Sequence, residues 1–212
     1  MFQDRAQGGR MLAHRLSGVC VDEAVVLGIT RGGVPVAREV SRLLTIPMDV
    51  LVVRRVTPAD RRLTLGAVAE TGEPQLRHAI HRFGPDQLVE FVRCAEAQVS
   101  REVAVYRMRH APLPLVDRTA ILVDDGVVTS ATARVACRLA RSRGARRVVF
   151  AAPVIPADAV AALSDLADDL PRAVTPPRAT AVRDWYVDFP AVTDADVLGL
   201  LGPVDEPATA GR

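Results

Sequence analysis

The sequence predicts an α/β fold with a parallel sheet, and three observations lead to this prediction. Short apolar segments rich in β-branched residues alternate with longer segments of helical periodicity, as expected for parallel strands joined by crossover helices. Two of the apolar segments end in a loop of small residues directly before a helical segment. The length of 212 residues suits one α/β domain. Because ligands of open parallel sheets bind at the carboxyl ends of the strands, we expect both loops to lie at one site.

Hydrophobic periodicity sets the elements expected in the first half of the chain. One face of a helix is expected to carry Phe2, Met11, Leu12 and Leu16, and Arg5 lies off that face. The elements expected after it are a strand at 23–29, a helix at 34–44, a strand at 49–55, an apolar segment at 65–69 and a helix at 86–108.

In the second half, Pro112 and Pro114 separate the long helix from the next strand. The expected elements are then a strand at 119–123, a helix at 131–143, a strand at 146–152, a helix at 157–167, a strand at 172–175 and a helix at 194–201. We therefore expect one domain over residues 1–201 and a disordered tail over residues 202–212.

The basic residues are of one type, because all 27 residues counted as lysine or arginine are arginine. The chain therefore cannot use a lysine as a base or for Schiff-base chemistry. Any phosphate must be bound by arginine, by backbone N–H groups or through a metal ion. The net charge of only +2 gives no reason to expect a nucleic-acid partner.

The chain contains no apolar stretch near the roughly 18 residues that a membrane span needs. Its first residues are also too polar for a signal peptide, so we expect a cytoplasmic protein with no membrane partner. Cys20, Cys94 and Cys137 are far apart in sequence, which favours buried reduced thiols over a metal site or disulfides.

The expected strand at 119–123 leads into the most informative motif of the chain. Two adjacent carboxylates and three hydroxyls follow it on a loop of small residues, Asp124, Asp125, Gly126, Val127, Val128, Thr129, Ser130, Ala131 and Thr132. A helix is expected next, and the unpaired N–H groups at a helix N-terminus attract anions. Two carboxylates would repel a phosphate alone, but they can accept hydrogen bonds from the hydroxyls of a phosphorylated sugar. The alternative is that these residues only cap the helix.

This motif resembles the 5-phosphoribosyl-1-diphosphate (PRPP) signature of the type I phosphoribosyltransferases. The resemblance implies that Asp124 and Asp125 are catalytic residues that bind the ribose hydroxyls, and that 126–132 is the ribose 5-phosphate loop. Ser130 stands where the family has glycine, and its Cβ is expected to restrict the backbone there. The resemblance extends over about residues 2–201 and implies a parallel-sheet core with a small hood built from the termini.

The loop after the first expected strand, Thr30, Arg31, Gly32 and Gly33, resembles the diphosphate-binding loop of the same family. A pair of glycines is a weak signal by itself, and it gains weight beside the acidic motif. In the family this loop carries a non-proline cis peptide that turns an N–H group toward the diphosphate. We therefore expect a cis or strained peptide at Thr30–Arg31, next to the 127–132 loop.

Further contacts follow from the resemblance. Arg54 and Arg55 begin an arginine-rich segment that is either a flap over the substrate, at 57–62, or a solvated loop. Glu70 either faces the site or sits in a turn. Trp185 or Tyr186 would stack on the acceptor base, unless these rings only attach the C-terminal segment to the core.

The implied reaction is displacement of diphosphate from PRPP by a nitrogenous base or a related acceptor. It requires Mg²⁺, which Asp124 and Asp125 would meet only indirectly, through ribose or water. Val128 replaces a carboxylate that 6-oxopurine enzymes carry, and the orotate enzymes use lysines, so adenine-like or unusual acceptors stay open. The alternatives are a PRPP-binding sensor without turnover and, less favoured, a ribose-phosphate hydrolase. A homodimer is possible.

Overall fold

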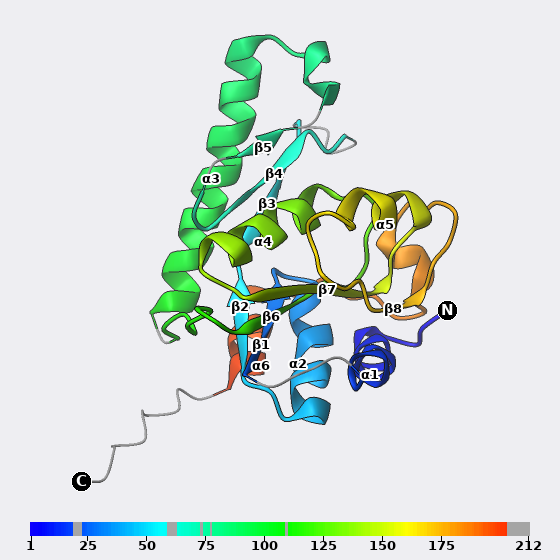
Figure 1. The fold of residues 1–212 in the computed structure, drawn as a ribbon. Helices are drawn as coiled ribbons and strands as arrows, with labels where there is room; N and C mark the ends of the chain where they lie inside the picture. Colours follow the sequence, from blue (N-terminus) through cyan, green and yellow to red (C-terminus); the bar gives the residue numbers. More distant parts are fainter. Residues whose placement is uncertain (19–22, 59–62, 73, 77, 109, 203–212) are drawn as a thin grey trace, which may run out of the picture.

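The structure is a computed structural model that describes residues 1–18, 23–58, 63–72, 74–76, 78–108 and 110–202. Its centre is a five-stranded sheet in the order β2-β1-β6-β7-β8, in which every neighbouring pair is parallel (Figure 1). The strands are β1 (Ala24–Ile29), β2 (Met48–Leu51), β6 (Thr119–Val123), β7 (Arg147–Val154) and β8 (Arg172–Val174). The parallel α/β fold that the sequence predicts is confirmed.

Helices cover both faces of this sheet (Figure 1). The helices α1 (Arg5–Leu16) and α2 (Gly33–Leu44) lie on one face, and α4 (Ala131–Ser142) and α5 (Ala157–Leu163) lie on the other. Because side chains alternate along a strand, Val25 and Leu27 of β1 pack under α4, whereas Ala24 and Val26 pack under α1 and α2. The α5 helix is shorter than the expected helix at 157–167.

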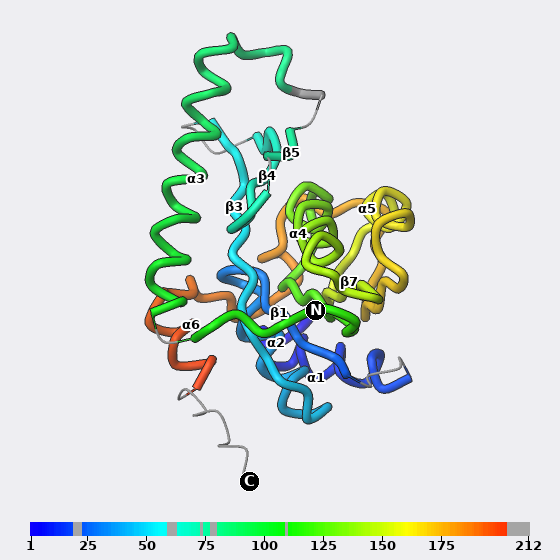
Figure 2. Tube along the Cα trace, turned by 60° about the vertical axis from the view of Figure 1, so that its left-hand side comes forward, coloured from blue at the N-terminus to red at the C-terminus, as the bar shows by residue number. Residues whose placement is uncertain are grey.

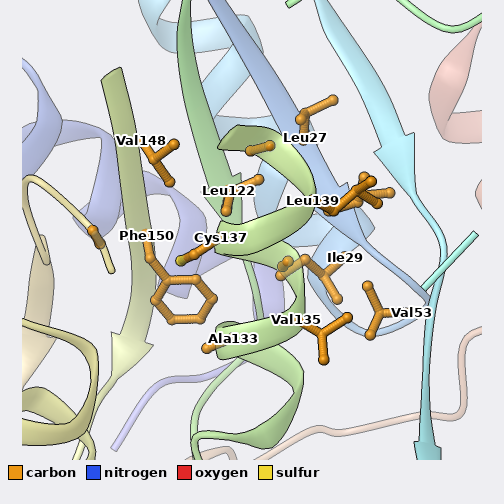
Figure 3. Close-up of a cluster of buried hydrophobic side chains, with 14 of the residues drawn as sticks. Leu27, Ile29, Val53, Leu122, Ala133, Val135, Cys137, Leu139, Val148 and Phe150 are labelled. Atoms are coloured by element: carbon orange, nitrogen blue, oxygen red, sulfur yellow. The ribbon is translucent and has the colours of Figure 1, made fainter. Parts of the chain in front are cut away.

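The packing of α4 decides where its N-terminus lies. Its buried side chains contact those of β1, β6 and β7, with Cys137 facing Leu122 and Phe150 in the middle (Figure 3). Each large apolar side chain buried in this way contributes about 1.5–3 kcal/mol. The helix begins directly after the 126–130 loop, so this packing holds the loop at the carboxyl end of β6. Burial also raises the pKa of the Cys137 thiol to about 12, so it stays protonated.

A second, antiparallel sheet stands beside the first. It consists of β3 (Val53–Val56), β4 (Gly66–Ala69) and β5 (Gln75–Leu76), and it continues through the short helix η1 (His78–Arg82) into the long helix α3 (Pro85–Arg107). Figures 1 and 2 show that this unit projects away from the parallel sheet. The expected single strand at 49–55 is therefore wrong. Its first part pairs with β1, and after Val52 the chain turns away to pair with β4.

The first residues of the chain lie beside the segment 185–188. The Phe2 N–H donates to the Trp185 carbonyl at 2.8 Å, and the Val187 N–H donates to the Phe2 carbonyl at 2.9 Å. Two helices complete this region, η2 (Val182–Trp185) and α6 (Asp194–Leu201), and α6 contacts α2 and α3. We call residues 1–5 and 180–190 the terminal hood. Of the predicted tail at 202–212, residues 203–212 lie outside the described residues.

The solvent exposure of several side chains differs from the sequence prediction. Met11, expected on the same helical face as Leu12 and Leu16, is 44% exposed, whereas Arg5, expected off that face, is buried. The expectation of buried thiols holds for Cys137 and is wrong for Cys94, which is exposed. Cys20 lies outside the described residues. Solvent exposure depends on which segments cover the helix, and helical periodicity does not report this.

Candidate functional site

The two loops singled out in the sequence meet at the carboxyl ends of β1 and β6. A Cβ atom on Gly32 would lie 2.1 Å from the Asp125 carboxylate, and one on Gly33 would lie 2.3 Å from the Val123 carbonyl oxygen. Only glycine permits this approach between the loops. The peptide bond between Thr30 and Arg31 is cis, as the resemblance to the diphosphate-binding loop implies, and both residues line a cavity together with residues of the 127–132 loop.

A cavity of about 450 Å³ opens between these loops. The predicted site residues that line it are Thr30, Arg31, Gly32, Arg54, Arg55, Asp124, Asp125, Val127, Val128, Thr129 and Thr132. The terminal hood closes another side of the cavity with Arg5, Phe189 and the 180–183 segment. Four predicted site residues belong to the same loops without lining the cavity: Gly33, Gly126, Ser130 and Ala131.

The two carboxylates of the motif have different surroundings. Asp124 Oδ1 accepts the Asp125 N–H at 2.8 Å, and no basic side chain among the described residues pairs with Asp124. Burial, and then the charge of Asp125, raise the pKa of Asp124 well above its usual range. Asp125 instead pairs with Arg5, whose Nε lies 2.9 Å from Oδ2. Burial raises the pKa of Asp125 as well, and Arg5 opposes that shift.

The raised pKa of Asp124 leads to a prediction about stability. Between the ordinary pKa of Asp and the raised one, the folded state binds more protons than the unfolded state, so the free energy of unfolding falls as pH rises. Asp124→Asn removes this cost. We expect the variant to unfold at a higher temperature than the unaltered chain at pH 7–8, and the difference to shrink as the pH is lowered through the raised pKa. A thermal unfolding series from pH 4 to 8 measures this, and an equal shift at every pH would contradict it.

The N-terminus of α4 carries unpaired donors beside the cavity. In the described part of the chain, the N–H groups of Thr129, Ser130 and Thr132 donate to no other residue, as expected for the first turn of a helix. The Ser130 backbone has φ −69° and ψ −1°, which is ordinary right-handed helical geometry. The expected restriction by the Ser130 Cβ is therefore wrong, because no left-handed conformation is needed there.

Ser130→Gly is consequently expected to leave the affinity for ribose 5-phosphate within about twofold, because the loop needs neither a Cβ nor the absence of one. The Ser130 side chain makes no capping hydrogen bond, so the cost in stability should be only a few tenths of a kcal/mol. Isothermal titration with ribose 5-phosphate measures the affinity. A large loss would identify the Ser130 hydroxyl as a phosphate ligand.

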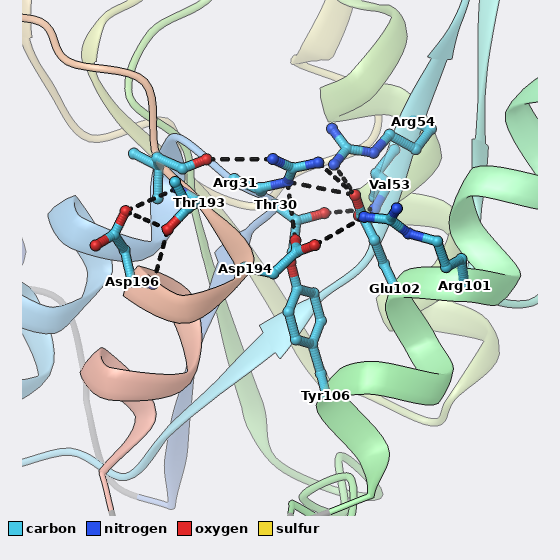
Figure 4. A network of polar contacts seen from close by, with 11 residues as sticks. Thr30, Arg31, Val53, Arg54, Arg101, Glu102, Tyr106, Thr193, Asp194 and Asp196 are labelled. Atoms are coloured by element: carbon cyan, nitrogen blue, oxygen red, sulfur yellow. Dashed lines mark hydrogen bonds and ion pairs between the residues drawn. The ribbon is translucent and has the colours of Figure 1, made fainter.

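The arginines beside the 30–33 loop are held by a buried carboxylate on α3. Glu102, 2% exposed, accepts from the Arg31 guanidinium at 3.2 Å and also pairs with Arg54 (Figure 4). Asp194 of α6 pairs with Arg31 at 3.1 Å and accepts a hydrogen bond from the Tyr106 hydroxyl at 2.7 Å. This cluster joins the loop to α3 and α6. Sequence reasoning missed Glu102, because an acidic residue that fits the helical periodicity of α3 carries no signal of such burial.

Three predicted contacts lie elsewhere. Glu70 pairs with Arg143 at 2.6 Å and with Arg107 at 3.5 Å, and it does not line the cavity. Tyr186 is buried, and its hydroxyl donates to the Asp125 carbonyl at 2.6 Å. The ring attaches the C-terminal segment to the core, which is the structural alternative for this residue, and Trp185 packs in the same cluster. Residues 59–62 of the proposed flap lie outside the described residues.

Within the described ranges, no group of three or more His, Cys, Asp or Glu side chains is arranged to hold a metal ion. None of the described helices combines the length and the apolar character that crossing a membrane requires.

Residues 6–171 match the family model of the phosphoribosyl transferase domain, a range that includes both loops. Two Mycobacterium tuberculosis proteins that carry a provisional phosphoribosyl transferase name are each 38% identical over 213 residues. The match covers 95% of this chain and 46% of each relative, so the chain spans about half the length of these curated relatives.

The chain is also similar to solved structures. TT1426 from Thermus thermophilus is 36% identical with a TM-score of 0.78, covering 94% of this chain and 97% of that one. AQ2163 from Aquifex aeolicus is 10% identical with a TM-score of 0.52, covering 83% of this chain and 74% of that one, and shows a likeness of fold alone. The family model covers both loops and the start of α4, whereas the hood residues that line the cavity lie outside its range. The chain belongs to the phosphoribosyl transferase domain family.

Proposed function

We propose that the protein is a Mg²⁺-dependent phosphoribosyltransferase, which displaces diphosphate from C1 of PRPP with a nitrogenous base or a related acceptor. The bond from C1 to the diphosphate oxygen breaks with its electron pair leaving on the diphosphate. The acceptor nitrogen forms the new bond to C1 and loses its proton. The observation that carries the proposal is that an acidic pair, a helix N-terminus and the 30–33 loop meet around one cavity.

The chain's part in this reaction is to position and to stabilise charge. The free N–H groups at the start of α4 suit the 5-phosphate, since they offer donors and the positive end of the helix dipole. Asp124 and Asp125 lie immediately before that loop and suit the ribose hydroxyls. The Thr30–Gly33 loop touches the acidic pair from the side of β1, which suits the diphosphate.

The acidic pair fits a Mg²⁺ ion that takes most of its ligands from substrate and water. Asp124 and Asp125 place hard oxygen donors at the cavity wall, and no larger ligand cluster exists within the described ranges. When bound, the ion would neutralise charge on the leaving diphosphate.

The acceptor stays open to adenine-like and unusual nitrogen compounds. Val128 lines the cavity with an apolar side chain, so no carboxylate is present there to bind a 6-oxopurine. Arg55 and Arg183 also line the cavity, and neither guanidinium has an ion-pair partner among the described residues. The charge of Arg55 also acts on Asp124, where it opposes the rise in the pKa. The two guanidinium groups favour an acceptor, or a part of PRPP, that carries negative charge.

One observation favours a second function, a PRPP-binding sensor without turnover. Glu102 forms ion pairs with both Arg31, which lies in the 30–33 loop, and Arg54, which lies in β3. A protein that kept the sugar-phosphate loop while its cations were occupied in this way would bind PRPP without stabilising the departing diphosphate.

Diphosphate release from PRPP, measured with and without Mg²⁺ across a panel of nucleobases, separates the two functions. Mg²⁺-dependent release with any base supports the transferase. Tight PRPP binding without release supports the sensor. Asp124→Asn tests the ribose site itself. Loss of one charge-assisted hydrogen bond should weaken PRPP binding by about 1.5–3 kcal/mol. An unchanged affinity in this variant would contradict the assignment of the ribose site.

A further inference from the structure

Arg5 is a buried cation at the first position of α1, outside the 6–171 range that matches the family model. Its side chain is 9% exposed, and the structure describes three contacts of its guanidinium. The Nε donates to Asp125 at 2.9 Å, and one terminal nitrogen donates to the Pro190 carbonyl at 2.7 Å. The guanidinium carbon lies 3.6 Å from the centre of the Phe189 ring, which is a cation–π contact.

The partners of Arg5 belong to two different parts of the fold. Asp125 is the second carboxylate of the sugar-phosphate motif, whereas Phe189 and Pro190 belong to the terminal hood. The hood reaches Asp125 a second time, because the Tyr186 hydroxyl donates to the Asp125 carbonyl. The side chain and the main chain of Asp125 are therefore both held by residues from the ends of the chain, 120 and 61 positions away.

Asp124 offers an internal comparison. It stands next to Asp125 on the same loop and lines the same cavity, yet no basic side chain among the described residues is paired with it. A guanidinium with two defined donor directions fixes the position of a carboxylate better than a single point charge does. Arg5 also offsets one of two adjacent negative charges in a buried setting, where such charges repel strongly.

From these contacts we propose that Arg5 is a positioning residue, which fixes the Asp125 carboxylate against the ribose and joins the terminal hood to the sugar side of the site. The proposal rests on the proposed function only in taking the ligand to be a ribose phosphate. It assigns Arg5 no contact with the diphosphate, because its partners are Asp125 and the hood. Arg5 itself makes no described contact with the Thr30–Gly33 loop, so we expect its loss to act on the sugar side of the cavity.

The test is a set of calorimetric titrations with two separate probes, ribose 5-phosphate and inorganic diphosphate. The variants are Arg5→Gln, Arg5→Lys, Asp125→Asn and the double variant Arg5→Gln/Asp125→Asn. Arg10→Gln is the matched control, since Arg10 lies on the same helix and, among the described residues, makes only a 3.7 Å ion pair with Glu39. Thermal unfolding of each variant shows whether it is folded under the titration conditions.

For Arg5→Gln we expect the affinity for ribose 5-phosphate to fall about tenfold or more, the loss typical of one charge-assisted hydrogen bond, with diphosphate affinity unchanged within about twofold. Arg5→Lys should restore part of the loss, because it keeps the charge but cannot donate both to Asp125 and to Pro190. The double variant should bind no more weakly than Asp125→Asn alone, since Arg5 acts through Asp125. Arg10→Gln should bind both probes as the unaltered chain does.

A purely structural role would weaken both probes equally, and that result would overturn the proposal. Full additivity in the double variant would overturn it as well, as would unchanged ribose 5-phosphate affinity in Arg5→Gln. If only Arg5→Lys folds, then unchanged ribose 5-phosphate affinity in that variant is the overturning result. The titrations need no turnover. Absence of diphosphate release by the unaltered chain would therefore end the transferase proposal while these affinities still decide the role of Arg5.

Discussion

Gly33→Ala is expected to lower the free energy of unfolding by about 1–3 kcal/mol, the range for overpacking a well-packed interior, and to weaken PRPP binding at least tenfold. A Cβ at this position would lie 2.3 Å from the Val123 carbonyl oxygen and 2.9 Å from the Asp124 Cα. Both atoms are main chain at the end of a central strand, so neither can rotate away as a flexible side chain can. The two loops must separate, and the acidic pair then leaves the side of the 30–33 loop.

Gly199→Ala is the matched control for this experiment. Gly199 lies within α6, and a Cβ there would meet nothing within 4 Å. The same substitution should raise stability by up to about 1 kcal/mol, because alanine favours the helix over the unfolded chain. Urea unfolding together with PRPP titration measures both effects. Equal stability and affinity in Gly33→Ala and the unaltered chain would show that the loops do not approach as closely as the structure describes.

Glu102→Gln is expected to lower the free energy of unfolding by about 3 kcal/mol, the lower end for breaking a buried ion pair. The substitution keeps the shape of the side chain and removes the charge that holds Arg31 and Arg54. The side chains of Arg31 and Arg54 are 33% and 20% exposed, and Arg31 would still pair with Asp194. The loss in the free energy of unfolding should therefore stay near this lower limit. For a chain of this length, about 3 kcal/mol corresponds to a fall of roughly 6–12 °C in the melting temperature.

Glu90→Gln provides the comparison on the same helix. Glu90 pairs with Arg93 on the surface, where the two side chains are 52% and 74% exposed. Pairs of this kind contribute about 0–1 kcal/mol, so its melting temperature should stay close to that of the unaltered chain. Differential scanning calorimetry on the two variants decides the matter. A shift in Glu102→Gln no larger than that in Glu90→Gln would mean that the cluster contributes little to stability.

Local sequence pattern was sufficient for the parts of the fold in which neighbouring residues act together. The strand at 119–123, the small-residue loop after it and the following helix are contiguous, so periodicity and turn residues reveal them directly. The same holds for the 30–33 loop, whose glycines mark a close approach before the structure identifies what approaches. The resemblance carried by these short motifs also anticipated that the two loops would be adjacent.

Only the tertiary structure decided the contacts that span the chain. Nothing local distinguishes Arg5 from other polar residues of α1, because its burial depends on Asp125 and the hood. Glu102 has the spacing of a solvated helical residue, yet it is enclosed once Arg31 and Arg54 arrive from other segments. The expected strand at 49–55 is continuous in sequence, and the competition between β1 and β4 as pairing partners divides it into two strands. A charged or β-branched residue shows its propensity in the sequence, but its partner, and therefore its role, is fixed only when distant segments pack together.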